Sequence, residues 1–188
     1  MRKYIFILSL LIFIQFSSTV NSQSLKIGFR FEPAILLSEQ NNSSSISFTP
    51  YSFYLTTIFE PIKNLGFELR PGYFLGGEYY GGFELGAFAR WMILSSKFYV
   101  IGGVTNHSND ILGSHNGGSG LSKNILYKSI GIGFQKDSKL GIDLMYCFTN
   151  DKDYAYSNVY DSHGSYRFEN KKMNSILKIA FSLSWDIL

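Results

Sequence analysis

The stretch GGFELGAFARWMIL, residues 81–94, carries two different faces on one strand. Side chains along a β-strand point alternately to opposite sides, so residues two apart share a face. One face is entirely apolar, running from Phe83 to Trp91 through every second residue. The other face carries Glu84 and Arg90 among glycine, a phenyl ring and a thioether. The fold depends on which of these two faces contacts water and which contacts another environment.

The same period of two recurs along most of the chain, whereas helical spacing is almost absent. Most segments of strand character are about 10 residues long, the length that a tilted strand needs to cross a bilayer. They are Leu25–Ile35, Ser47–Phe59, Leu65–Phe74, Gly82–Ile93, Phe98–Asn106, Ile125–Phe134, Leu140–Thr149 and Ser175–Ile187. The pattern does not decide which face of Phe98–Asn106 points inward.

The connections between these segments alternate between short and long. The short ones are Glu60–Asn64, Ser95–Lys97 and Gln135–Lys139. We expect the long ones to be loops, at Leu36–Ile46, Gly76–Gly81, His107–Asn124 and Asn150–Asn174. With antiparallel strands, all short turns fall at one end and all long loops at the other. This sorting is typical of outer-membrane barrels.

The polar face is rich in Gly, Ser and Ala, which a narrow barrel interior requires and a solvated strand face does not. Its charges balance five to five. The cations are Lys26, Arg30, Arg70, Arg90 and Lys178, and the anions are Glu32, Glu68, Glu84, Asp143 and Asp186. Because an unpaired charge in a confined interior is costly, we predict an interior ion-pair network. The alternative is a set of solvated surface pairs of little energetic value.

These patterns predict an all-β fold, an eight-stranded antiparallel up-and-down transmembrane β-barrel with its apolar face toward lipid. Aromatic residues near the segment ends are expected to form two interfacial girdles. These residues are Tyr73, Phe74, Tyr79, Tyr80, Trp91, Phe98, Tyr99, Tyr127, Phe148 and Trp185.

The N-terminus has the pattern of a cleaved secretory signal peptide. Arg2 and Lys3 precede the apolar run Ile5–Phe16, and small and polar residues follow. We therefore divide the chain into a signal peptide, residues 1–22, and one barrel domain, residues 23–188. Export by this peptide and the barrel pattern together predict location in the bacterial outer membrane.

Two quoted stretches carry a resemblance to a known family. FELGAFARWMILSSKFYVIGGVTNHSN (83–109) and SIGIGFQKDSKLGIDLMY (129–146) resemble the outer-membrane β-barrel domain family of Bacteroidetes-type bacteria. The layout of eight strands resembles the OmpA/OmpX-type barrels. The resemblance implies an integral outer-membrane protein that reaches the membrane through the barrel-insertion machinery.

Composition argues against several classes of function. The formal net charge of +3 comes without a Lys/Arg cluster, so no nucleic-acid partner is expected. Cys147 is the single cysteine, and the three histidines are scattered without metal-ligand spacing. We predict no cofactor and no metal.

One motif raises an enzymatic alternative. Residues 106–109, Asn-His-Ser-Asn, are similar to the His-x-Ser-Asn motif of lipid A 3-O-deacylases, which are also outer-membrane barrels. Here His107 and Ser108 are adjacent, and neighbours on a strand point to opposite faces. They would converge only across a β-bulge, so a polar rim at the start of a loop is the favoured interpretation.

We therefore expect a non-enzymatic barrel with a structural or adhesive role. We predict poor conductance of solutes, because charged pairs would plug so narrow a lumen. Loop tyrosines among Asp, Ser, Asn and Gly are candidate contact residues: Tyr154, Tyr156, Tyr160 and Tyr166. The expected partners are outer-membrane lipid, lipopolysaccharide and an extracellular ligand bound through the loops. We expect the protein to be a monomer. Alternatives are a deacylase-like hydrolase and a secreted soluble barrel that carries an apolar ligand.

Overall fold

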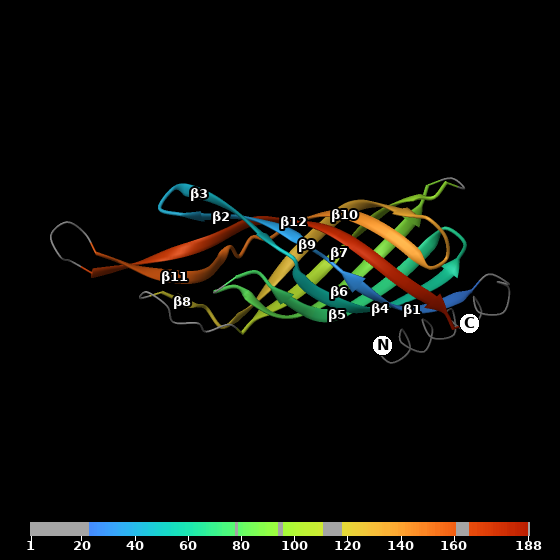
Figure 1. Cartoon of the computed structure of the whole chain (residues 1–188), viewed down its shortest axis with the longest axis horizontal. Coiled ribbons are helices and arrows are strands. Elements are labelled where there is room, and N and C mark those ends of the chain that lie inside the picture. Colours follow the sequence, from blue (N-terminus) through green and yellow to red (C-terminus); the bar gives the residue numbers. More distant parts are fainter. Residues whose placement is uncertain (1–22, 78, 94–95, 111–117, 161–165, 188) are drawn as a thin grey trace, which may run out of the picture.

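The computed structural model describes residues 23–77, 79–93, 96–110, 118–160 and 166–187 (Figure 1). The predicted signal peptide, residues 1–22, lies outside the described residues. The secondary structure of the described part consists of β-strands. It contains no helix that is long and apolar enough to cross a membrane.

Eight antiparallel strands close into a barrel, which confirms the predicted fold class. Each strand pairs with the next around the ring, and the last strand pairs with the first, for example at Phe29 opposite Leu183. In ring order the strands are β1 (Ser24–Phe31), β4 (Tyr51–Ile62), β5 (Leu65–Leu75), β6 (Gly81–Met92), β7 (Phe98–Asn109), β9 (Lys123–Gln135), β10 (Leu140–Phe148) and β12 (Tyr166–Asp186). Closure leaves each ring strand with two neighbours.

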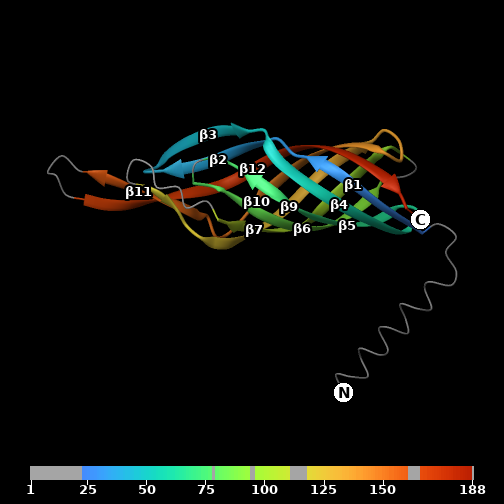
Figure 2. The same cartoon turned by 60° about the horizontal axis from the view of Figure 1, so that its bottom comes forward.

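The connections at the two ends of the barrel differ in length (Figures 1 and 2). The described chain starts and stops at one end, which also carries the short turns β4–β5, β6–β7 and β9–β10; we call it the turn end. In the β9–β10 turn, the Asp137 carboxylate accepts hydrogen bonds from the backbone N–H groups of Lys139 and Leu140, both at 2.8 Å. These bonds lower the pKa of Asp137. The longer connections lie at the opposite end, the hairpin end.

The prediction of a loop over Leu36–Ile46 is wrong, because this segment forms a β-hairpin. Strand β2 (Ala34–Gln40) pairs with β3 (Ser43–Thr49) and, on its other side, with β12. The predicted strand Leu25–Ile35 is correspondingly interrupted at Pro33, which lacks the N–H that a ladder needs. Asn41 and Asn42 have φ values of 53° and 59°, the left-handed conformation that a tight two-residue hairpin turn requires and asparagine tolerates.

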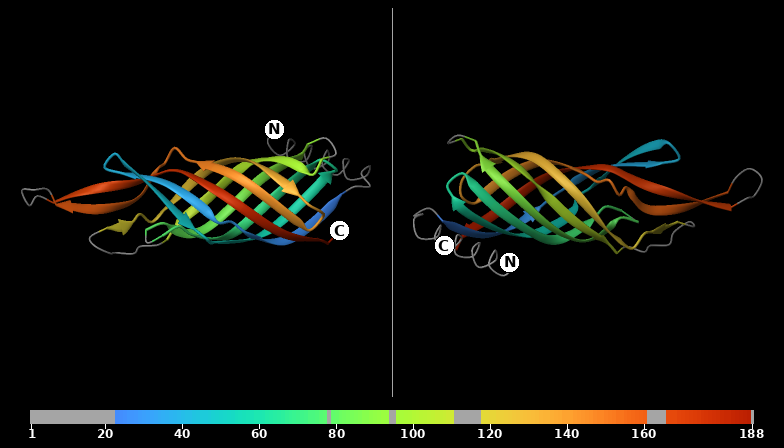
Figure 3. Two further views of the ribbon diagram at one scale, coloured as in Figure 1. Left: turned by 45° about the horizontal axis from the view of Figure 1, so that its top comes forward. Right: turned by 180° about the vertical axis from the view of Figure 1, so that it is seen from behind.

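The long connection Asn150–Asn174 is also largely strand rather than loop. Strand β11 (Asp153–Tyr160) pairs with the first half of β12, so the two form a hairpin beyond the barrel wall (Figure 3). A short strand, β8 (Ser119–Gly120), adds to β11 at Ala155 and Tyr156. The hairpin end therefore carries two ordered extensions, β2–β3 and β11–β12.

Burial in the barrel follows the inside-out pattern. In β6, Glu84 and Arg90 are buried while Phe83 and Trp91 are exposed on the outer wall. The same holds for Phe67, Leu144 and Phe181, each close to half exposed. Strand β7, whose faces the sequence left open, points Tyr99, Ile101, Thr105, His107 and Asn109 inward.

Part of the predicted aromatic girdles is wrong, because four of the rings lie inside the barrel. Phe74, Tyr80, Tyr99 and Tyr127 are each at most 2% exposed. Trp91, Phe98 and Trp185 do lie on the outer face near the turn end, and Tyr73 and Phe148 lie on it toward the hairpin end. Interior glycines make room for the inner rings.

Adjacent glycines in β7 provide a matched test of this packing. A Cβ at Gly103 would lie 2.2 Å from the Ala87 carbonyl oxygen and 2.6 Å from the Phe88 ring, whereas at Gly102 the nearest atom is 3.7 Å away. We expect G103A to lower the free energy of unfolding by about 1–3 kcal/mol. G102A should change it by less than about 1 kcal/mol. Urea titration followed by heat-modifiable gel migration measures both, and equal losses would contradict the packing.

Candidate functional site

The centre of the barrel holds a cluster of ion pairs from strands that are distant in sequence. Arg30 on β1 donates to Glu32 and to Asp143 on β10. Arg70 on β5 donates to both carboxylate oxygens of Glu68, at 2.7 and 3.0 Å, and reaches Glu32 at 3.4 Å. All five side chains are at most 3% exposed. Guanidinium groups suit this role because they donate several hydrogen bonds from one plane.

A second interior cluster surrounds Glu84. Its carboxylate accepts a hydrogen bond from Lys178 at 2.7 Å and another from the Tyr54 hydroxyl. His107 Nδ1 lies 3.1 Å from the other carboxylate oxygen. Lys178 also lies 2.9 Å from the Tyr54 hydroxyl and 3.5 Å from Glu32, which links this cluster to the first.

Toward the turn end, the network becomes looser and reaches solvent. Arg90 donates to Gln135 at 3.0 Å and lies over the Tyr99 ring, 4.1 Å from its centroid. Lys26 pairs with Glu60 at 2.9 Å and lies 3.9 Å from Asp186. The structure thus buries nine of the ten predicted network residues. It places Asp186 at the rim, where its side chain is 48% exposed, because β12 ends there.

The interior is filled rather than open. The four central cations, Arg30, Arg70, Arg90 and Lys178, face four central anions, Glu32, Glu68, Glu84 and Asp143. The internal cavity between the two clusters has a volume of about 10 Å³, which is about enough for one water molecule. Between the two clusters, the described side chains can stabilise the barrel and leave no room for a solute along its axis.

An aromatic layer covers the charged clusters on the side of the hairpin end. The Tyr80 ring stacks on His107 with centroids 4.4 Å apart and meets Phe74 edge to face at 5.7 Å. The Tyr80 hydroxyl donates to that of Tyr127 at 2.8 Å. Tyr154 packs edge to face on Tyr80 at 5.4 Å. The sequence predicts Phe74, Tyr80 and Tyr127 in the interfacial girdles and Tyr154 in a loop, so it does not predict that these rings meet inside the barrel.

Asn109, at the end of β7, ties the connections of the hairpin end together. Its side chain is fully buried, and its amide oxygen accepts from the Gly81 N–H at 2.9 Å. Its amide nitrogen lies 2.8 Å from the Leu121 carbonyl and 3.2 Å from those of Tyr79 and Tyr154. One side chain thus joins three separate connections over the aromatic layer. Its place in a polar tetrapeptide gave no sign of this role.

The residues of the deacylase-like motif do not converge. His107 lies inside the barrel beside Glu84, whereas Ser108 points to the other face and donates to Asp110 at 3.2 Å. The pairing of β7 with both neighbours runs without a bulge through these residues. The expectation that His107 forms part of a polar rim is wrong, since the inward face of β7 continues past the predicted end of the strand. Among the described residues, no three His, Cys, Asp or Glu side chains gather in a way that could hold a metal ion.

The predicted contact tyrosines do not form one surface. Tyr154 turns inward onto the aromatic layer, and burial raises its pKa, with a hydrogen bond to Ser38 acting in the opposite direction. Tyr156 is half-buried and packs edge to face on Phe168, with centroids 5.4 Å apart. Tyr160 and Tyr166 are paired in the β11–β12 ladder, and their side chains lie outside the described part of the structure.

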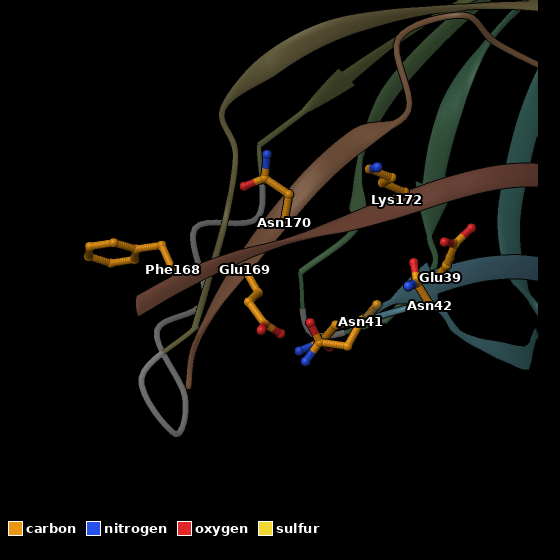
Figure 4. Close-up of a pocket in the computed structure, with 8 residues that line it drawn as sticks. Glu39, Asn41, Asn42, Phe168, Glu169, Asn170 and Lys172 are labelled. Carbon is orange, nitrogen blue, oxygen red and sulfur yellow. The ribbon is translucent and has the colours of Figure 1, made fainter. Parts of the chain in front are cut away.

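A polar pocket of about 400 Å³ lies between the β2–β3 turn and β12, beyond the barrel (Figure 4). The β2–β3 hairpin is held beside β11 by a 2.5 Å hydrogen bond from the Gln40 amide to the Ser157 hydroxyl. Asn174 likewise donates to Glu39 at 3.2 Å. Carboxylates, amides, one ammonium group and one ring line the pocket: Glu39, Gln40, Asn41, Asn42, Phe168, Glu169, Asn170 and Lys172. Sequence reasoning missed this pocket because it requires two hairpins that were predicted as loops.

Comparison with known proteins finds similar folds and no assigned family. No protein-family model and no curated protein matches the chain. Neisserial surface protein A is 13% identical with a TM-score of 0.46, over 87% of this chain and 99% of that one. The outer-membrane protein AlkL in lipid bilayers is 11% identical with a TM-score of 0.47, over 90% and 92%. OprG of Pseudomonas aeruginosa is 11% identical with a TM-score of 0.44, over 86% and 96%. At these levels of similarity, no ligand or activity transfers to this chain.

The ion-pair network generates a prediction about stability. Asp143→Asn keeps the shape of the side chain but removes one of the two carboxylates to which the buried Arg30 donates, so that only Glu32 remains. We expect a loss of about 3–5 kcal/mol in the free energy of unfolding. The matched control D186N, at the exposed rim, should cost less than about 1 kcal/mol. Urea titrations of both variants in detergent measure the difference. A D143N protein as stable as D186N would show that the central pairs contribute little.

Proposed function

We propose that the protein is an integral outer-membrane barrel with a non-enzymatic role, structural or adhesive, exerted through its two extensions. One observation carries the membrane location: charged side chains fill the inside while large apolar side chains cover the outside. Phe29, Phe53 and Ile130 are each about 60% exposed on the outer wall. Soluble proteins rarely expose a continuous apolar surface of this kind. In hydrocarbon, such a surface needs no further cover.

The filled interior favours this role over the two binding alternatives. A carrier of apolar ligands needs a large apolar cavity, and a pore needs an open axis. The central ion pairs and the aromatic layer occupy that space. The separation of His107 from Ser108 gives no support to the deacylase-like reaction. The proposed partners are therefore membrane lipid and lipopolysaccharide around the wall, and an extracellular ligand at the extensions.

The extensions support an interaction role because they present polar groups on paired strands. The turn at Asn41 and Asn42 and the pocket beside it present amides and carboxylates on paired strands rather than on a loose loop. Rigid presentation lowers the entropic cost of binding. We propose that these hairpins face the cell exterior while the turn end faces the periplasm, in line with the general layout of such barrels. The resemblance to Bacteroidetes-type barrels supports the same proposal.

The two tryptophans of the chain test the membrane location without any mutation. Trp91 and Trp185 are 51% and 40% exposed, and both lie on the outer wall near the turn end. In vesicles, lipids brominated on the acyl chain should quench their fluorescence. Bromines near the headgroup should quench more than bromines near the bilayer centre, because these rings lie at the interface. A soluble protein that lipids leave unquenched would refute the proposal.

A pair of cysteine variants tests which end faces outward. Ser44 on β3 and Ser138 in the β9–β10 turn are both exposed, and the native Cys147 is buried at 3%. On intact cells, a membrane-impermeant maleimide should label S44C and leave S138C unlabelled until the outer membrane is permeabilised. Labelling of S138C alone on intact cells would place the extensions in the periplasm and contradict an adhesive role.

A further inference from the structure

One charged side chain lies on the apolar outer wall. Lys128 on β9 is exposed, and it is the single charged residue among the described outward-facing positions of the eight ring strands, with β12 counted where it pairs with β10. Its neighbours on the same face of β9 are Leu126 and Ile130, 54% and 63% exposed. Its cross-strand partners are Val104 on β7 and Phe148 on β10. A cation in this position needs an explanation, because lipid-facing charges are costly.

The depth of Lys128 brings its ammonium group close to the membrane surface. Phe134 marks the turn end of the outward face of β9, six residues away. Six residues of a strand tilted by about 40° rise roughly 15 Å, in an apolar band about 25 Å tall. The backbone of Lys128 therefore lies in the outer half of the band. Its flexible side chain can extend toward the headgroups while its methylene groups stay in the apolar layer.

Polar side chains lie on the outer wall between Lys128 and the hairpin end, beside Leu126. Asn106 on β7 lies diagonally across from Lys128, since it pairs with Leu126. One step further toward the hairpin end, Ser108 pairs with Asn124. The described residues give Lys128 no ion-pair partner. The acids at this rim have other partners, since Asp110 accepts from Ser108 at 3.2 Å and Asp151 pairs with Lys123 at 2.5 Å.

We propose that Lys128, with Asn106 beside it, binds the phosphate group of an outer-leaflet lipid. The inference rests on the proposed membrane location and adds a specific lipid contact to it. A phosphate offers the negative charge that the ammonium group lacks within the protein, and its remaining oxygens can accept from the Asn106 amide. A phosphorylated lipid supplies this group at the depth that the lysine reaches, with acyl chains that lie along Leu126, Ile130 and Phe148. Basic side chains at the edge of the apolar band recognise lipid headgroups in this way.

Native mass spectrometry of the mature protein, released from mixed micelles, tests the proposal. The probes are lipid A with both phosphates, the same lipid after phosphatase treatment, and inorganic phosphate as a competitor. We expect K128Q to weaken binding of the phosphorylated lipid by about tenfold, the effect of losing one charge-assisted hydrogen bond. K128R should retain binding. The matched control K139Q removes an exposed lysine at the turn end and should bind like the wild type.

The outcomes separate this inference from the proposed function. Equal binding by K128Q and the wild type, or equal binding of the phosphorylated and dephosphorylated lipids, would overturn the inference. Displacement of the lipid by millimolar inorganic phosphate would assign the site to free phosphate and also overturn it. Tryptophan quenching by brominated lipids is measured on the same variants. A protein that is quenched but shows no preference for phosphate refutes the lipid site alone, whereas one that is not quenched refutes the membrane location.

Discussion

The structure depends on ion pairs that cross the lumen of a closed ring. Arg30 on β1 reaches Asp143 on β10, although β12 lies between these strands in the wall. Through Glu32 the same cluster includes Arg70 and Glu68 on β5. These contacts exist only when the ring is closed, and closure without them would leave charges unpaired at high cost. Wall and interior therefore depend on one another, which favours a single cooperative fold.

The interior changes character along the barrel axis, and this change explains why the lumen is closed. At the turn end, Lys26 and Glu60 are hydrated in part. Ion pairs fill the centre, and the rings of Tyr80 and Tyr127 follow toward the hairpin end. The Asn109 amide nitrogen then lies within hydrogen-bond distance of three backbone carbonyls from different connections. Opening the axis would separate the ion pairs of the centre and break the hydrogen bonds of Tyr80 and Asn109, which would leave several buried groups unsatisfied.

The barrel was predictable from the sequence because an apolar outer face and a narrow lumen impose a strict period of two. The prediction failed where a residue was assigned by its position near a strand end and the alternation of faces was not applied. Tyr127 shares the parity of Ser129 and so lies inside, but its position near a strand end suggested a girdle. The extensions could not be predicted for a different reason. Ser43–Ser47 has little apolar character, and it is strand because β2 supplies a pairing partner. Tertiary pairing of this kind overrides local composition.

The extensions can accept substitutions that the wall cannot. The wall is constrained on both faces, by its continuous apolar surface outside and by paired charges inside. The hairpins β2–β3 and β11–β12 continue the strands of the wall, so the barrel positions their backbone. The barrel does not constrain the identity of most of their side chains. Gln40 and Ser157 join the two hairpins outside the ring. Substitutions around the Asn41–Asn42 turn can therefore change the chemistry of the pocket without disturbing the ion pairs that hold the barrel closed, and this independence is what an interaction surface requires.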